Sequence, residues 1–201
     1  MDPNIWGPPL WDMLFTFCFK CSPNAIPTLQ HLFSLLETAI PCSNCRRSYA
    51  AYRKELLPIT SIASGGHLAS AIWLWTIHDM VNQKIGKICI TFDKLEKRYT
   101  AFDFLTSDFS VIDVLCIIVY GAKLKRRHIE FVRCVGDLLR SCSVVFRLPD
   151  ILTQHLIKIE NDPLQLTDML FACKNDIFEV YGLDKIDRDE FNRRYKACIE
   201  T

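Results

Sequence analysis

The sequence contains a Cys-x-x-Cys motif whose flanking residues suit thiol chemistry. Cys42 and Cys45 follow Pro41 and precede Arg46 and Arg47. The proline closes the preceding helical pattern, so the motif is expected at the start of a helix, where backbone amides and nearby cations stabilise a thiolate. Such thiols exchange disulfides at neutral pH. The motif alone fits redox chemistry, metal binding and incidental cysteines equally well, so all three interpretations stay open at this point.

A second pair, Cys18 and Cys21, gives the overall spacing Cys-x2-Cys-x20-Cys-x2-Cys, which is close to that of a four-thiolate zinc site. The main alternative is therefore a zinc-binding helical assembly module that uses Cys18, Cys21, Cys42 and Cys45. Against zinc, the first pair lies in an aromatic helical run rather than in a glycine-containing turn. It then consists either of buried cysteines or of a second redox pair. The remaining cysteines on apolar helical faces are expected to pack as small hydrophobic side chains: Cys116, Cys134, Cys142, Cys173 and Cys198.

Composition excludes several functional classes. The 201 residues are 50% hydrophobic and carry 24 basic and 23 acidic side chains, so the chain can bury a core but lacks the basic tract of a nucleic-acid-binding protein. The longest apolar run, residues 111–122, is interrupted by Asp113 and is too short to span about 30 Å of hydrocarbon. The first residues resemble neither a secretory signal nor a transit peptide, so we expect a cytoplasmic protein whose mature chain begins at Met1. Ten cysteines make thiol chemistry the leading hypothesis.

Helical periodicity dominates the sequence and predicts an all-α fold. The first predicted helices are Leu10–Cys21, Pro27–Ile40, Cys42–Leu56 and His67–Ile85, followed by a short helix and connection over Phe92–Asp108. They form a four-helix bundle with a short fifth helix. Further helices are predicted over Val111–Lys125, His128–Phe146, Pro149–Glu160, Pro163–Tyr181 and, after a capping box that begins at Asp187, up to Ile199. We therefore predict two regions, 1–104 and 105–201, the second of unknown role.

Three separated segments carry a family pattern when they are taken together. They are WGPPLW (residues 6–11), PCSNCRR (41–47) and WLWTIHDMVNQKIGK (73–87). In order and spacing they resemble the Erv/ALR sulfhydryl oxidases, whose hallmarks are a WG with a second Trp, a PCxxC, and a W followed by HNxVNxxLxK. The resemblance covers about residues 4 to 100, and its first two segments are most similar to the enzymes of large cytoplasmic DNA viruses.

Three positions depart from the usual pattern of the family. Phe15 stands where many members have a His, Asp79 replaces the Asn of the His-Asn pair, and Cys89 has no evident partner for the structural disulfide of cellular members. These departures favour the viral branch.

The resemblance implies a bound FAD with Cys42 and Cys45 beside its isoalloxazine ring as the catalytic pair. It assigns His78 to adenine packing, Asn82 to a polar contact, and two lysines to the pyrophosphate. The complete set of implied cofactor-binding residues is Trp6, Gly7, Trp11, Phe15, Tyr49, Trp73, His78, Val81, Asn82, Lys84, Lys87 and Tyr99.

The resemblance also implies the reaction and the partners. Electrons pass from a protein dithiol to Cys42 and Cys45, then to FAD and molecular oxygen, with release of hydrogen peroxide. The implied substrates are protein dithiols, with a thioredoxin-like carrier as the expected intermediary, and the protein is expected to be a homodimer. A viral member would act in the host cytoplasm and could enter the virion.

Overall fold

The chain folds into α-helices over most of the length that the structure describes. The computed structural model describes residues 2–58, 61, 65–101, 107–120, 126–142, 146–159 and 162–200, with the backbone alone for 197–200. These ranges contain ten α-helices and no β-strand, which confirms the predicted all-α fold. None of the described helices is both long enough and apolar enough to cross a membrane.

The first half of the chain contains five helices. They are α1 (Pro3–Lys20), α2 (Ile26–Ala39), α3 (Ser43–Glu55), α4 (Gly66–Lys84) and α5 (Phe92–Thr100). The predicted bounds of α2, α3 and α4 are confirmed to within a few residues, because their flanking proline and glycine residues are unambiguous helix boundaries.

The predicted start of the first helix, at Leu10, is wrong, because α1 begins seven residues earlier at Pro3. Asp2 is the N-cap, and its carboxylate accepts a hydrogen bond at 2.8 Å from a backbone N–H two residues further on. Pro3 suits the first helical position, where no N–H donor is needed. Pro8 and Pro9 lie inside the helix, and the packing of the apolar residues around them outweighs the backbone hydrogen bonds that they cannot donate.

The second half contains five more helices. They are α6 (Asp108–Tyr120), α7 (Arg126–Ser141), α8 (Leu148–Lys158), α9 (Leu166–Val180) and α10 (Arg188–Glu200). The predicted cap of the last helix is confirmed, because the Asp187 carboxylate accepts a hydrogen bond from the Glu190 N–H at 2.7 Å. The predicted boundary between residues 104 and 105 lies in 102–106, outside the described residues, and stays a prediction.

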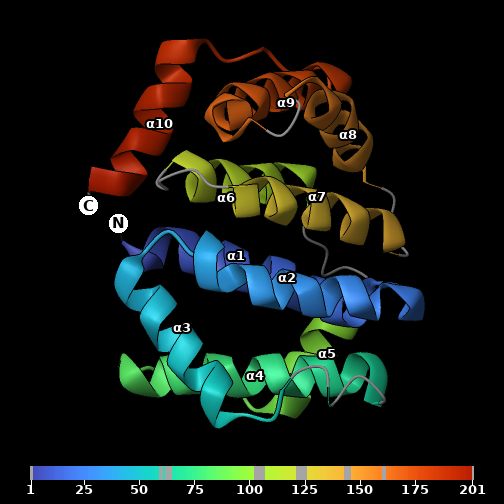
Figure 1. Ribbon diagram of the computed structural model, residues 1–201, viewed down its shortest axis with the longest axis vertical. Helices are drawn as coiled ribbons and strands as arrows, with labels where there is room; N and C mark the ends of the chain where they lie inside the picture. Colours follow the sequence, from blue (N-terminus) through green and yellow to red (C-terminus); the bar gives the residue numbers. More distant parts are fainter. Residues whose placement is uncertain are drawn as a thin grey trace.

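The helices stack in layers (Figure 1). α3, α4 and α5 lie at one end, α1 and α2 follow, α6 and α7 form the next layer, and α8 and α9 lie at the other end with α10 along one side. The most extensive contacts across the middle join α2 to α7 and α1 to α6. The second half therefore covers the face of α1 and α2 that points away from α4, and a second copy of the chain cannot bind there.

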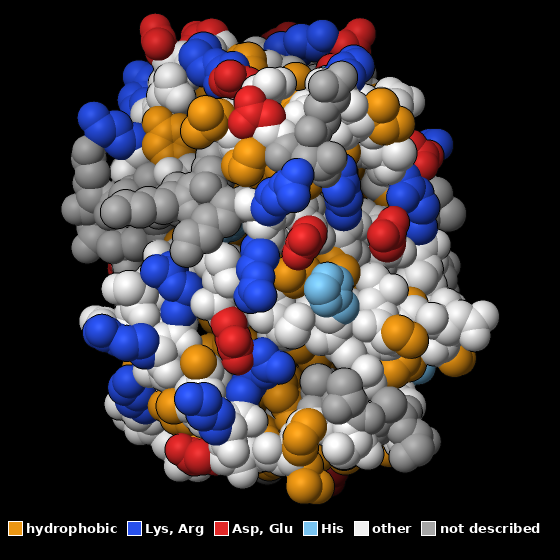
Figure 2. Space-filling view, in the orientation of Figure 1, with side chains coloured by type: hydrophobic (Ala, Val, Ile, Leu, Met, Phe, Trp, Pro, Cys, Tyr) orange, Lys and Arg blue, Asp and Glu red, His pale blue; other side chains and the backbone are white. Residues whose placement is uncertain are grey.

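A single apolar core runs through these layers. Met13 and Phe17 of α1 and Leu29 and Phe33 of α2 are completely buried, because both helices have neighbours on two sides. At the surface, Figure 2 shows basic and acidic side chains mixed over the face that it draws, without a continuous basic area.

Asp108 fixes α8 to α6. This carboxylate is 3% exposed and accepts hydrogen bonds from the backbone N–H groups of Arg147 at 2.9 Å and Leu148 at 3.1 Å. The Tyr181 hydroxyl, from the residue after α9, donates a third at 2.9 Å. One buried carboxylate thus stabilises the N-terminus of α8 and joins three helices of the second half.

We expect Asp108→Ala to lower the free energy of unfolding by about 2–4 kcal/mol, because it leaves buried N–H and O–H donors without their charged acceptor. Urea unfolding measures the change. Asp150→Ala in the first turn of α8 is the matched control, since its side chain is 79% exposed and makes only a 3.6 Å ion pair with Arg140, and it should change the free energy by less than about 1 kcal/mol. Equal effects of the two substitutions would contradict the assigned role.

Candidate active site

Cys42 and Cys45 form a disulfide at the beginning of α3, with their Cα atoms 5.2 Å apart. Cys42 is the N-cap residue of the helix, and its Sγ accepts a hydrogen bond from the Cys45 backbone N–H at 3.2 Å. The sequence predicted this position at a helix start. The amide that contacts the sulfur stabilises negative charge on Cys42 when the disulfide is reduced.

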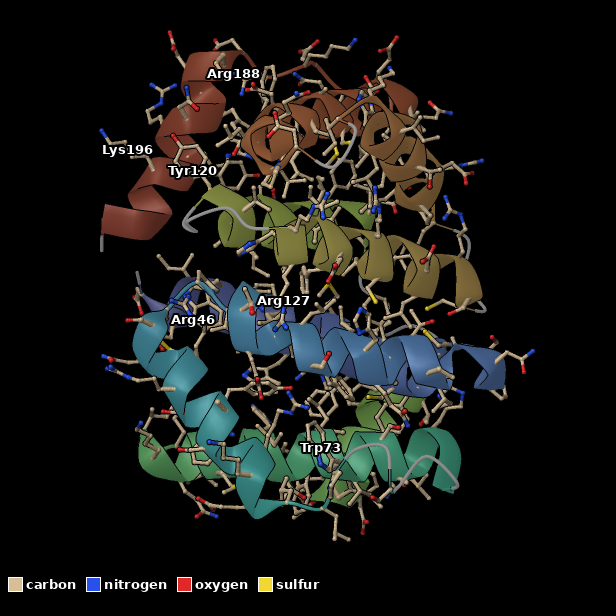
Figure 3. The ribbon with its side chains drawn as sticks, viewed as in Figure 1. Arg46, Trp73, Tyr120, Arg127, Arg188 and Lys196 are labelled. Carbon is tan, nitrogen blue, oxygen red and sulfur yellow. A yellow bond between two sulfur atoms is a disulfide. The ribbon has the colours of Figure 1, made fainter. Side chains whose placement is uncertain are left out.

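Arg46 holds the segment that leads into the disulfide. Its guanidinium donates hydrogen bonds to the carbonyl oxygens of Ile40, at 2.5 Å, and Pro41, at 3.2 Å. Figure 3 labels Arg46 in the first turn of α3. The interaction ties the end of α2 to the start of α3 and places a permanent positive charge one residue from Cys45.

The disulfide opens onto a cavity of about 760 Å³ in the first half of the chain. Both cysteines line this cavity, and α1, α3, α4 and α5 supply its walls. The predicted cofactor-binding residues that line it are Trp6, Gly7, Trp11, Phe15, Tyr49, His78, Val81, Asn82, Lys84, Lys87 and Tyr99. Segments far apart in the sequence therefore meet in one space beside the Cys42–Cys45 disulfide.

One wall of the cavity is aromatic. The Trp11 ring lies 4.7 Å from the His78 ring, centroid to centroid, and Phe15 lies 5.8 Å from His78 and 5.2 Å from Tyr99. Flat, polarisable side chains at these separations suit a planar ring system. Phe15 thus fills the position where the resembled family usually has a histidine.

These observations allow the comparison with known families. Residues 8–100 match the model of the Erv1 / Alr family. The Erv1/Alr region, as we call residues 8–100, ends with α5 and includes both cysteines of the disulfide. The comparison with curated proteins found no match, and neither did the comparison with solved structures.

His78 of the Erv1/Alr region is a wall residue whose burial favours the neutral imidazole. Burial lowers the pKa of its imidazole, while the carboxylates of Asp79 and Asp12 act in the opposite direction. Its Nε2 lies 3.3 Å from the side-chain amide nitrogen of Asn82, which is also 3.4 Å from the Cys89 sulfur. Asn82 thus helps to fix the orientation of the His78 ring, and its contact with the cofactor stays a prediction.

Basic side chains lie at the mouth of the cavity. Lys84 donates a hydrogen bond to the Ser48 hydroxyl at 2.6 Å, and Lys87 donates one to the Asn4 side-chain oxygen at 3.2 Å. Both lysines are exposed. Their ammonium groups can therefore exchange these hydrogen bonds to uncharged side chains for contacts with an anionic group such as a pyrophosphate.

Trp73 is the predicted cofactor residue that does not line the cavity. It lies on α4 (Figure 3), where it stacks on Phe33 at 5.4 Å and donates a hydrogen bond to the Leu57 carbonyl at 3.1 Å. Its position supports the junction between α2, α4 and the end of α3. Tyr49 lines the cavity but its hydroxyl donates to the Phe33 carbonyl at 2.7 Å, so only its ring faces the open space.

Sequence reasoning missed a polar group in the cavity wall. Asp12 lines the cavity, accepts a hydrogen bond from the Tyr99 hydroxyl, and lies 3.4 Å from the Arg98 guanidinium. The available signal was a carboxylate between Trp11 and a run of apolar helical residues. Burying an unpaired charge on such a face costs free energy, so the carboxylate is expected to have a partner.

The four-thiolate alternative does not match this geometry. Cys42 and Cys45 are bonded to each other, whereas the Cys21 sulfur contacts Cys142, and Cys18 is completely buried in α1. Within the described residues, no three His, Cys, Asp or Glu side chains are grouped as metal ligands.

FAD fits the cavity in size and in chemistry. The volume of about 760 Å³ lies in the range of about 300–1,000 Å³ that is typical of ligand sites. Two buried nitrogen atoms of lining residues, Trp6 Nε1 and His78 Nδ1, have no hydrogen-bond partner among the described atoms. A Cβ at Gly7 would meet no atom within 4 Å, so the helix surface there is open to a ligand.

The lowered pKa of His78 predicts a pH-dependent stability. The unfolded chain binds the His78 proton more tightly than the folded protein does, so this contribution is complete above about pH 6.5 and decreases as the pH falls below it. We expect His78→Phe to weaken the loss of stability between pH 7 and pH 5. Urea unfolding of both proteins at several pH values measures it, and an unchanged pH dependence would contradict the assignment.

Proposed function

We propose that the protein is an FAD-dependent sulfhydryl oxidase that forms disulfide bonds in substrate proteins. The observation that carries this proposal is the opening of the Cys42–Cys45 disulfide onto the same aromatic cavity that fits the cofactor. A thiol–disulfide centre and a site for a planar electron acceptor are thereby adjacent, as two-electron transfer requires. The family match to residues 8–100 supports the same activity.

The first step is thiol–disulfide exchange at Cys42. A thiolate of the substrate attacks the Cys42 sulfur, and Cys45 leaves as a thiolate. Cys42 is the accessible choice because it precedes α3 and is followed by exposed Ser43 and Asn44, whereas Cys45 lies within the helix. The second substrate thiolate then attacks the substrate sulfur of the mixed disulfide and releases Cys42, which completes the oxidation of the substrate.

Regeneration of the Cys42–Cys45 disulfide requires a two-electron acceptor, which FAD held in the cavity would supply. The chemistry that FAD supplies is the transfer of two electrons from the Cys42/Cys45 dithiol to molecular oxygen, with hydrogen peroxide as the product. The chain orients the cofactor: Trp11, Phe15 and His78 offer ring faces, and Lys84 and Lys87 offer cations for the pyrophosphate. Trp73 would act indirectly, by supporting α4.

The proposal extends to partners and location. Protein dithiols are the substrates, delivered by a thioredoxin-like carrier, and the residues that resemble viral enzymes suggest action in a host cytoplasm and in virions. A homodimer would use a surface other than the face of α1 and α2 that packs against α6 and α7.

The purified protein should be yellow, with a flavin band near about 450 nm, and should release FAD on denaturation. Cys45→Ser should keep the flavin but reduce dithiothreitol oxidation to background, because the cofactor is held by ring and phosphate contacts rather than by this sulfur. Oxygen consumption measures turnover, and Cys134→Ser in α7 is the control that keeps it. A colourless protein that takes up no added FAD would end the proposal.

Gly7→Leu should weaken FAD binding by on the order of tenfold or more, because its side chain extends from a position where a Cβ has open space into the cavity. Gly7→Ala is the matched control and should bind FAD nearly normally. Flavin fluorescence titration gives the affinities, and circular dichroism verifies that both variants are folded. Normal affinity in a folded Gly7→Leu protein would show that FAD does not lie beside this turn of α1.

A further inference from the structure

The two halves of the chain meet at a pair of cysteines far from the Cys42–Cys45 disulfide. Cys21, the residue after α1, has extended backbone angles and forms an isolated antiparallel bridge with Cys142, the residue after α7. The Ser22 N–H donates a hydrogen bond to the Ser141 carbonyl at 2.8 Å. The two sulfur atoms are 3.4 Å apart.

This backbone arrangement already has the geometry of a cross-strand disulfide. The Ser22–Ser141 hydrogen bond makes Cys21 and Cys142 a non-hydrogen-bonded antiparallel pair, in which the Cα atoms are about 4.5 Å apart. Disulfides accept Cα separations from about 4.4 Å upward. Small side-chain rotations therefore suffice to close the bond.

We propose that Cys21 and Cys142 form a disulfide that links the α1–α2 layer to the α6–α7 layer. The two residues are separated by 121 positions in the sequence, so the bond closes a loop that contains more than half of the chain. Cys142 lies outside the matched residues 8–100. The proposed bond does not depend on the proposed oxidase activity.

The local hydrogen bonds prepare one sulfur for exchange. A hydrogen bond from Cys142 lowers the pKa of Cys21, against the opposing effect of burial, and raises the pKa of Cys142. The Cys21 sulfur also lies 3.4 Å from the Leu138 carbonyl oxygen, which accepts the proton of the protonated thiol. When the pair loses a proton, the negative charge is therefore favoured on Cys21, with the Cys142 thiol as its hydrogen-bond donor.

The oxidant is an external disulfide. The thiolate of one cysteine attacks a sulfur atom of the external disulfide, forms a mixed disulfide with it and expels one thiol of the oxidant. The other cysteine then attacks the protein sulfur of the mixed disulfide and expels the second thiol of the oxidant. Two thiols are oxidised and one disulfide is reduced. The 14 residues of α2 separate this site from Cys42 by about 20 Å, so the oxidant is a small-molecule disulfide or the Cys42–Cys45 disulfide of another copy.

Cys18 is the competing partner for Cys21. It lies inside α1, is completely buried, and its pKa is raised by burial. Cys21 leaves the helix in an extended conformation and directs its sulfur toward Cys142. The contacts therefore favour the long-range pair over the Cys18–Cys21 pair that the sequence spacing suggests.

Tryptic mapping distinguishes the two pairings. The full-length protein is equilibrated under argon with reduced and oxidised glutathione, alkylated, and digested without reduction. Cleavage after Lys20 separates Cys18 from Cys21. We expect peptide 21–46 linked to peptide 141–147. Absence of this product under oxidising conditions, or linkage of peptide 21–46 to peptide 1–20, would overturn the proposal.

Thermal unfolding tests the effect of the bond. Reduction breaks the Cys42–Cys45 disulfide in the wild type, in Cys142→Ser and in Cys21→Ser, but of these three only the wild type also loses the Cys21–Cys142 bond. Reduction should therefore lower the Tm of the wild type by about 5–15 °C more than the Tm of Cys142→Ser or Cys21→Ser. Cys134→Ser, in the helix that precedes Cys142, is the control and should respond like the wild type. An equal redox response in all four proteins would show that no linking disulfide forms.

Discussion

The burial of α1 on two opposite sides is the constraint on which the rest of the structure depends. One side of this helix supplies Trp6, Trp11 and Phe15 to the cavity, and the other side packs against α6. From Leu10 to Lys20 this helix has no exposed position, so it is apolar almost all round there. Its axis is therefore fixed by contacts from both halves, and so are the aromatic rings that it presents beside the Cys42–Cys45 disulfide.

The sequence predicted the elements whose signals are local. The Pro41 boundary and the Cys-x-x-Cys motif located the start of α3, and glycine residues located the ends of α4. The family resemblance contributed most of the cavity residues, because the matched motifs face one another across α1, α3 and α4. Local signals failed at α1, whose start was predicted at Leu10 although the helix also includes Pro8 and Pro9, since the packing that tolerates these prolines comes from other helices.

Long-range contacts could not be predicted from spacing. Cys21 has a nearer cysteine in the sequence, yet its sulfur contacts Cys142 because α1 and α7 end at the same edge of the stack. The role of Asp12 beside Tyr99 also depends on a helix that begins about 80 residues later. Trp73 matches a family position, but its distance from the cavity follows from how α4 packs against Phe33. Such features depend on the final layer arrangement, which no short segment encodes.

The layered arrangement also affects how the sequence can change over evolution. Every described residue that lines the cavity precedes residue 100, and α8 and α9 lie beyond the α6–α7 layer, at the end of the stack away from α4. Substitutions and insertions in this outer layer alter stability without contact with the reacting groups. The outer layer is thus free to acquire new surface properties, while α6 and α7 remain restricted by the shape of the helices that they cover.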